Sequence, residues 1–178
     1  MTKNFLIFVC LSISFVAFSC QKEPKTQGGP DCYQIPLENS VSIKEKKDLL
    51  GKKVYVEWST TDGQSSSFTS TVEQVDTLLD SGVPILVING MSSGQYHQYV
   101  SFTDPTQPLV TIILNKTDNG GLKVFKISPA IKGEGQVWNG GKSPIGVEET
   151  LTEIIIYTNN IPSPDGEKFM CMKVVIEK

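Results

Sequence analysis

The residues Gly90-Met91-Ser92-Ser93-Gly94 match the G-x-S-x-G pattern and directly follow the apolar run Ile85–Ile88. In hydrolases this pattern places a nucleophilic serine on a sharp strand-to-helix turn, and a histidine base follows later in the chain. Here the only histidine, His97, comes five residues after Ser92, and the residues around it alternate like a strand. We therefore predict a glycine- and serine-rich loop and no catalytic residues, with a serine hydrolase kept as the last alternative.

The residue types and spacings that bind metal ions are missing from the sequence. One histidine cannot build a multi-histidine site, and neither C-x-x-C nor H-E-x-x-H occurs. Three aspartates sit close to glycines, but none has the spaced acids and distal glutamate of an EF-hand calcium loop. Because aspartate and glycine favour turns, we predict turns at Asp62-Gly63, Asp118-Asn119-Gly120 and Asp165-Gly166, and we expect neither a metal nor another cofactor.

Aromatic side chains could form a binding surface, because flat rings stack on sugars and peptides. Trp58 shares one side of its strand with Val54, so we assign it to the core. Trp138 lies in a glycine-rich connection, where we expect an exposed loop tryptophan, and His97 and Tyr99 share the solvent side of a strand. The candidate ligand-binding residues are therefore His97, Tyr99 and Trp138, the alternative being ordinary exposed side chains.

The first two dozen residues have the pattern of a secretory signal. Lys3 supplies a positive start, Phe5–Phe18 is an uncharged run of 14 residues, and the small residue Ser19 precedes Cys20. As a helix the run would reach ~21 Å, short of the ~30 Å hydrocarbon core of a membrane. We therefore expect a signal peptide over 1–19 that is removed, rather than a permanent transmembrane anchor.

Ala17-Phe18-Ser19-Cys20 resembles the lipobox of bacterial lipoproteins, although that family usually has leucine at the first of these positions and a small residue at the second. The resemblance implies that Cys20 carries a fatty acid, such as palmitate, and holds the protein at a membrane. An ordinary small-x-small site would cut before the same cysteine. Gln21-Lys22-Glu23 is similar to a short export signal, which implies an outer-membrane lipoprotein displayed at the cell surface. Residues 20–31 are polar and are predicted to form a flexible tether.

Two of the four cysteines remain for the domain itself, because Cys10 lies in the signal and Cys20 is the predicted lipidation site. Cys32 and Cys171 would suit a disulfide in an exported chain, and it would tie the start of the domain to its last strand. The alternative is two separate buried thiols, since sequence alone does not bring their Cα atoms within bonding range.

The composition predicts one acidic domain, residues 32–178. Removing residues 1–19 leaves 159 residues, with 15 lysines and 19 acids, so the side-chain charge is 15 − 19 = −4. The chain contains no arginine, the usual residue for bidentate contacts with phosphate and guanine. We therefore exclude nucleic acid as a partner.

Most of the domain alternates with a period of two and is punctuated by turn residues, which predicts an antiparallel β-sandwich or barrel of about 7–8 strands. A capping box at Ser42–Glu45 predicts a short N-terminal helix over 43–50. Residues 68–80 fit a helix or a strand, and their β-branched residues favour the strand. Residues 129–148 hold many glycines and prolines and are predicted to form a long irregular connection.

These features together predict a lipid-anchored envelope protein with a non-enzymatic binding or accessory domain for a protein or a glycan. A structural subunit of an envelope complex is one alternative. Another is a lipocalin-like carrier, because Leu49-Leu50-Gly51-Lys52-Lys53-Val54-Tyr55 is faintly similar to the entry of a lipocalin barrel, with Lys53 in place of that family's tryptophan. Such a carrier requires an apolar cavity inside the barrel.

Overall fold

The computed structural model describes residues 32–35, 40–41, 46–77, 82–93, 99–118, 120–134 and 136–178. Predictions for the segment 1–19, the tether 20–31, Cys20 and His97 fall outside the described residues. The described part contains short 3-10 turns, η1 (Lys46–Leu49) and η3 (Gly140–Lys142). Its strands are β1 (Ser40–Val41), β2 (Lys53–Thr60), β3 (Ser65–Thr77), β4 (Pro84–Ile88), β5 (Gly90–Ser93), β6 (Tyr99–Phe102), β7 (Leu109–Lys116), β8 (Leu122–Ala130), β9 (Ile145–Glu149), β10 (Glu153–Pro162) and β11 (Phe169–Glu177).

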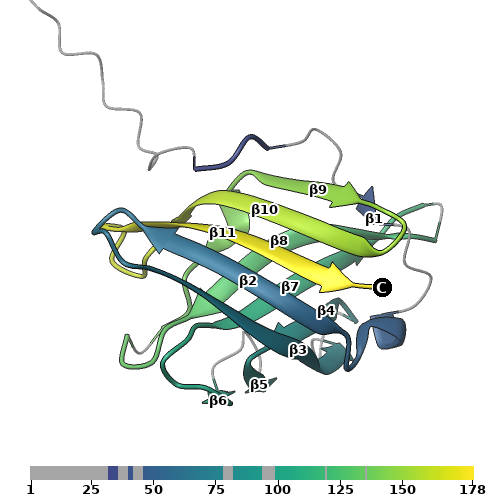
Figure 1. The fold of residues 1–178 in the computed structure, drawn as a ribbon, viewed down its shortest axis with the longest axis horizontal. Coiled ribbons are helices and arrows are strands. Elements are labelled where there is room, and N and C mark those ends of the chain that lie inside the picture. The colour runs from purple at the N-terminus through teal and green to yellow at the C-terminus, as the bar shows by residue number, and fades with distance from the viewer. Residues whose placement is uncertain are drawn as a thin grey trace, which may run out of the picture.

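The strands build one antiparallel sheet in the order β1-β8-β7-β4-β3-β2-β11-β10-β9, with β5 and β6 paired separately. Most neighbours in this sheet are also neighbours along the chain, as expected when tight turns join alternating segments. The pair β2–β11 is different, because it joins the beginning of the domain to its end, from Met170↔Thr60 to Ile176↔Val54. In Figure 1 these two strands cross the middle of the wall that faces the viewer.

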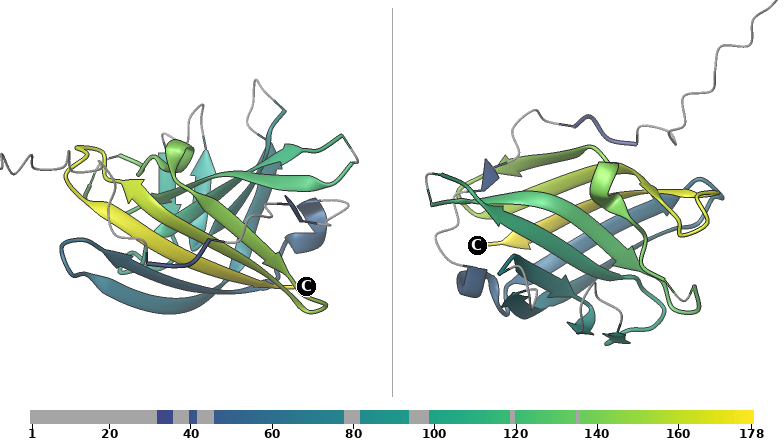
Figure 2. Two further views of the ribbon diagram at one scale, coloured as in Figure 1. Left: turned by 90° about the horizontal axis from the view of Figure 1, so that it is seen from above. Right: turned by 180° about the vertical axis from the view of Figure 1, so that it is seen from behind.

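Eight strands curl into a nearly closed antiparallel barrel. The remaining strand of the sheet, β1, has only two residues and extends the edge of β8. The free ends of the sheet, at β8 and β9, approach each other. Figure 2 shows this curl from two further sides. The predicted fold class, a mainly β sandwich or barrel of about 7–8 antiparallel strands, is therefore confirmed.

Apolar side chains from one face of each long strand fill the barrel interior. Buried and less buried residues follow each other along much of β2, β10 and β11, as expected for strands with one face toward the core. Val56, Ile112, Ile127 and Met172 are completely buried, and Trp58 joins them at 8% exposure, as predicted. Since buried apolar surface stabilises a fold by ~25 cal/mol per Å², this interior is the main source of stability.

The predicted N-terminal helix over 43–50 is wrong. The described residues of that segment form only the 3-10 turn η1, and the predicted capping box at 42–45 lies outside the described residues. Gly51 takes a positive φ of 76°, and its N–H donates to the Val72 carbonyl at 2.9 Å. The chain therefore turns directly into β2, with Leu49 buried at 3% exposure, because tertiary hydrogen bonds replace further helical ones.

The predicted irregular connection over 129–148 is also partly wrong, because it contains β9 and the last residues of β8. In β9, Val147 pairs with Ile156 of β10 and is buried, while Gly146 between the apolar positions hides the alternation. For the segment 68–80, by contrast, the strand favoured by its β-branched residues is confirmed over 68–77, which lie in β3, and residues 78–80 fall outside the described residues.

The β5–β6 hairpin forms a second layer outside the barrel. Every residue of β4 is buried, so this strand is covered on both faces. Leu86 and Ile88 belong to the barrel core, whereas Ile85 and Val87 belong to a separate cluster against which Phe102 of β6 packs. The hairpin therefore covers apolar surface that a single-layered barrel would leave in water.

Residues 32–35 run along the outside of the barrel and are fixed there by covalent and hydrogen bonds. Cys32 and Cys171 form a disulfide, with Cα atoms 6.0 Å apart, so the predicted pair is joined. The Asn159 amide pairs with the backbone of Tyr33, donating to its carbonyl at 2.8 Å and accepting from its N–H at 3.2 Å. Asn159 sits in a β-bulge of β10, an irregularity that typically redirects a side chain.

Removing this disulfide should destabilise the domain, because it closes a sequence separation of 139 residues. For the full chain carrying Cys32→Ser and Cys171→Ser we expect the free energy of unfolding in urea to fall by ~2–5 kcal/mol. The wild-type chain treated with a reductant is the matched control and should lose the same amount. Equal unfolding midpoints with and without the disulfide would contradict this account.

Candidate functional site

Trp138 does not lie on an exposed loop, so its prediction as a ligand-binding residue is wrong. Its side chain is 1% exposed and belongs to the barrel core, and its indole N–H donates to the Glu134 carboxylate. Its backbone N–H donates to the Pro129 carbonyl at 2.8 Å, which folds the connection back over β8. Gly140 allows this close approach, since a Cβ there would lie 2.0 Å from the Ile127 carbonyl oxygen.

The G-x-S-x-G segment does not form a nucleophile elbow among the residues that are described. Gly90–Ser93 is strand β5, and Ser92 is 3% exposed. The Gln74 side-chain amide pairs with the backbone of Ser92 as a neighbouring strand would. It accepts from the Ser92 N–H at 2.8 Å and donates to the Ser92 carbonyl at 3.0 Å. Gly90 has a φ of 140°, and a Cβ at this position would lie 2.0 Å from the Ser101 carbonyl oxygen. The close approach of β5 to β6 therefore requires glycine here.

The remaining predicted residues are not brought together by the described structure. His97 lies outside the described residues, and Tyr99 begins β6 without a described side chain. Trp58 points into the barrel, where its indole N–H donates to Gln107 at 3.5 Å.

Three tyrosines lie together on the outer wall of β2, β11 and β10, the wall that faces the viewer in Figure 1. In register across this wall, Tyr157 stands opposite Lys173, and Lys173 stands opposite Glu57. Tyr33 comes from the segment before the first strand, and its ring contacts that of Tyr157 with centroids 5.7 Å apart. We call the surface formed by Tyr33, Tyr55, Glu57, Tyr157 and Lys173 the tyrosine face.

Tyr33 is the centre of the tyrosine face. Its hydroxyl donates to the Glu57 carboxylate at 3.2 Å. Partial burial, and next the negative charge of Glu57, raise the pKa of Tyr33 above its usual value. The hydrogen bond to Glu57 and the contact with the Tyr157 ring hold the Tyr33 ring in place.

Two hollows open on either side of Tyr33. The first, which we call the serine groove, has a volume of about 390 Å³ and is lined by Tyr33, Tyr55, Glu57, Trp58, Ser59 and Ser65–Ser67. The second, of about 530 Å³, is lined by Cys32, Tyr33, Gln34, Ile35, Pro144 and Asn159. Both volumes lie within the range of small-ligand pockets, ~300–1,000 Å³.

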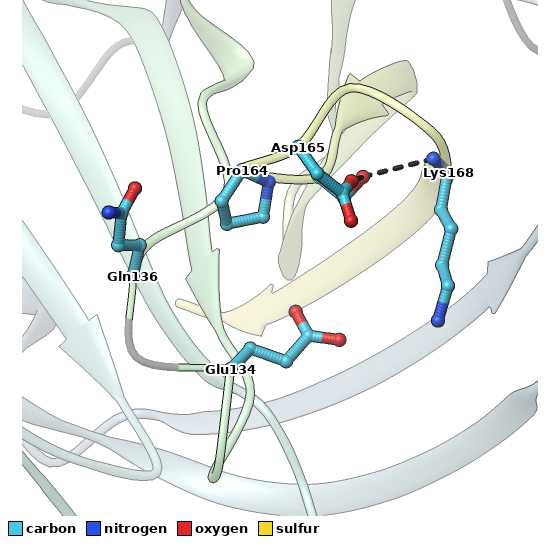
Figure 3. A pocket seen from close by; sticks show the side chains of 6 residues that line it. Glu134, Gln136, Pro164, Asp165 and Lys168 are labelled. Atoms are coloured by element: carbon cyan, nitrogen blue, oxygen red, sulfur yellow. Dashed lines mark hydrogen bonds between the residues drawn. The ribbon is translucent and has the colours of Figure 1, made fainter.

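A third hollow, of about 550 Å³, lies between the connection that follows β8 and the turn that joins β10 to β11. Figure 3 shows Glu134 and Gln136 on the first of these segments and Pro164, Asp165 and Lys168 on the second. Its charged groups bind one another or nearby residues. Glu134 accepts from Trp138, and the Lys168 ammonium pairs with Asp62 at 2.9 Å, outside the hollow.

Hydrogen bonds in this third hollow lower the pKa of Asp165 below that of an ordinary aspartate. A hydrogen bond from the Ser163 hydroxyl, and next one from the Glu167 N–H at 3.0 Å, lower the pKa of Asp165. The Lys168 N–H in turn donates to the Ser163 hydroxyl at 2.9 Å. These groups close a turn, as the Asp165-Gly166 pattern predicts, and they leave few polar atoms for a ligand.

Within the described ranges, no cluster of three or more His, Cys, Asp or Glu side chains could hold a metal ion. Among the same residues, no helix is long and apolar enough to span a membrane.

Sequence reasoning missed the tyrosine face because its members are far apart along the chain. Tyr33 stands beside Cys32, and Tyr55 lies on the exposed side of the alternating strand β2, at 40% exposure. The signal that could have found Tyr55 was its solvent-side position. No local signal, however, predicts that Tyr157 is placed two strands away from β2 on the same wall.

Asp62 should titrate far below an ordinary aspartate. A hydrogen bond from the Thr60 hydroxyl, and next the contact with Lys168, lower its pKa from 3.8 to about 2. Because the folded pKa is depressed, the stabilisation from Asp62 is present above pH 3.8 and is lost as the pH falls through 2. Thr60→Val should raise this pKa toward 3.8, measured by NMR titration of the carboxyl carbon, whereas Thr69→Val on β3 should not. A wild-type midpoint near 3.8 would contradict the assignment.

No protein-family model, curated protein sequence or solved structure matched this chain. The comparisons therefore assign neither a family nor a function. The functional assignment depends on the chain's own residues and on the geometry of its outer wall.

Proposed function

We propose that this chain is a lipid-anchored envelope protein whose β domain is a non-enzymatic binding or accessory module for a protein or a glycan. The resemblance of Ala17-Phe18-Ser19-Cys20 to a lipobox supports the anchor. The polar segment 20–31 would separate the domain from an outer membrane and display it at the cell surface. The absence of arginine from the sequence argues against nucleic acid as the partner.

The observation that carries the binding role is the tyrosine face. Tyrosine supplies a large flat contact area and a polar tip, and it loses little conformational entropy on binding. Here three tyrosines gather on one wall, beside two hollows. The segment that carries Tyr33 is fixed to this wall by the Cys32–Cys171 disulfide and by the hydrogen bond from the Asn159 amide to the Tyr33 carbonyl. Ordered aromatic groups on a rigid sheet are suited to recognition.

A lipocalin-like carrier is the second candidate, and the strand order favours it. The barrel is an up-and-down sheet closed by its first and last long strands, as in eight-stranded carriers. The filled interior argues against it, because Leu86, Val110, Ile156 and Met170 have at most 2% exposure and leave little room for a ligand. A structural subunit remains a third candidate. The exposed large hydrophobics of the described part come from separate segments: Leu50, Tyr55, Met91, Phe125 and Leu151.

The lipid anchor is tested by metabolic labelling of cells that express the full chain with a radioactive fatty acid. The wild-type protein should carry the label, because the thiol of Cys20 is the proposed attachment point. The Cys20→Ala chain should not carry it, whereas Cys10→Ala, a change within the proposed signal, should remain labelled. A Cys20→Ala chain that keeps the label would refute the anchor.

The binding role is tested by affinity capture with the full-length protein in detergent, exposed to detergent extracts of cells and to host fluids. We expect the wild-type chain to retain a defined protein or glycan, because its outer wall presents ordered aromatic groups. A chain with Tyr33→Ala and Tyr157→Ala should retain less, and Leu151→Ala, at a 98% exposed position, is the control. Capture of nothing specific by the wild type would count against the proposal.

A further inference from the structure

We propose that the serine groove beside Tyr33 binds a neutral glycan, with Tyr55 as the stacking surface. This inference rests on the proposed function and names its ligand class and its site. The groove was not evident from the sequence, because its walls come from β2, β3 and the segment before them.

The aromatic part of the groove suits a sugar ring. The C–H groups on the face of a pyranose pack against a flat aromatic ring, as other apolar groups do. Tyr55 is 40% exposed, so one face of its ring is open, whereas the Tyr33 ring is already in contact with Tyr157. Tyr55 is therefore the residue on which a sugar would stack, and Tyr33 forms the wall beside it.

The polar part of the groove consists of hydroxyls, which is the chemistry of the sugar itself. A serine hydroxyl donates one hydrogen bond and accepts others, so it can match either role of a sugar hydroxyl. Ser65 and Ser67 point out of the same side of β3 and are exposed. Among the described residues their hydroxyls have no hydrogen-bond partner, and they remain available to a ligand.

Charge selects a neutral ligand over an acidic one. Glu57 is the only charged residue among the described lining of the groove, and its carboxylate would repel phosphate, sulfate or a uronic acid. Lys173 lies nearby on β11 but has its ammonium over the Tyr157 ring, 5.9 Å from the centroid. A carboxylate that accepts from hydroxyls is, by contrast, a strong hydrogen-bond partner for a neutral sugar.

The other hollows carry this inference less well. In the hollow of Figure 3, the carboxylates and the lysine are bound to Trp138, to Asp62 and to the turn itself. In the hollow beside Cys32, the Asn159 amide is occupied by the Tyr33 backbone. Only the serine groove, among the three described hollows, combines an open aromatic ring with unpartnered hydroxyls.

The test uses the full-length protein in detergent and measures affinity for four probes by titration calorimetry. The probes are the neutral tetrasaccharides of β-linked glucose, α-linked mannose and β-linked xylose, and the acidic tetrasaccharide of galacturonate. We expect at least one neutral probe to bind and the acidic probe to bind at least tenfold more weakly.

Variants then locate the site. Tyr55→Ala should weaken the neutral probe about tenfold, equivalent to ~1.4 kcal/mol, and the Ser65→Ala, Ser67→Ala double variant about threefold or more. Phe125→Ala removes an aromatic ring of similar exposure, 53%, from β8 outside the groove and should leave the affinity unchanged. A thermal unfolding curve of each variant should match the wild type, since the altered side chains are exposed.

Each outcome decides the proposal. Neutral binding that depends on Tyr55 but not on Phe125 supports it. Binding that is unaffected by Tyr55→Ala, or that prefers galacturonate, overturns it. If no probe binds while the same protein captures a protein partner from cells, the glycan inference fails and the proposed function stands. If neither probe nor partner binds, both fail.

Discussion

The pairing of β2 with β11 is the interaction on which the rest of the structure depends. It joins the first long strand to the last and so converts a row of hairpins into a nearly closed barrel. Only after closure do the apolar faces of β2, β10 and β11 become an interior, with Val54, Val174 and Ile176 buried against one another. The same pairing places Cys171 beside the start of the domain, where Cys32 can reach it. One long-range contact therefore sets the core, the disulfide and the outer wall.

Because the interior of the nearly closed barrel is filled, the proposed recognition would have to occur on the outside of the barrel. The large side chains of Leu86, Ile112 and Met172 occupy the space that a carrier would keep for its ligand. The β5–β6 hairpin covers the apolar outer surface of β4, so that side is also occupied. The wall of β2, β11 and β10 is different, because it carries tyrosines, a glutamate and serines at its surface. Its polar and aromatic side chains are the reason that the proposed binding role is placed on this wall.

Features that depend on residues close together in the sequence were predicted correctly, whereas several features that depend on distant residues were not. Strands with regular alternation, such as those of Val54 and Met172, were predicted correctly, because alternation is a local consequence of having one buried face. The turn glycines Gly63 and Gly166 were also predicted, since a positive φ is a local requirement. The helix at 43–50 and the exposed Trp138 were wrong. In both cases tertiary structure replaced the local preference: the Gly51 N–H donates to Val72 in the first case, and Trp138 is buried in the barrel core in the second.

The sequence by itself determined that the domain is mainly β, that its net charge is negative and that it lacks arginine, and it offered Cys32 and Cys171 as a candidate pair that the tertiary structure then joined. It also contains the lipobox-like residues on which the proposed anchor rests. Only the tertiary structure decided which polar residues share a surface. Tyr33, Tyr55 and Tyr157 are spread over more than a hundred residues, and their proximity depends on strand order and on the bulge at Asn159. Alternation assigns a side chain to one side of its strand, but only the closed sheet determines which strands lie side by side.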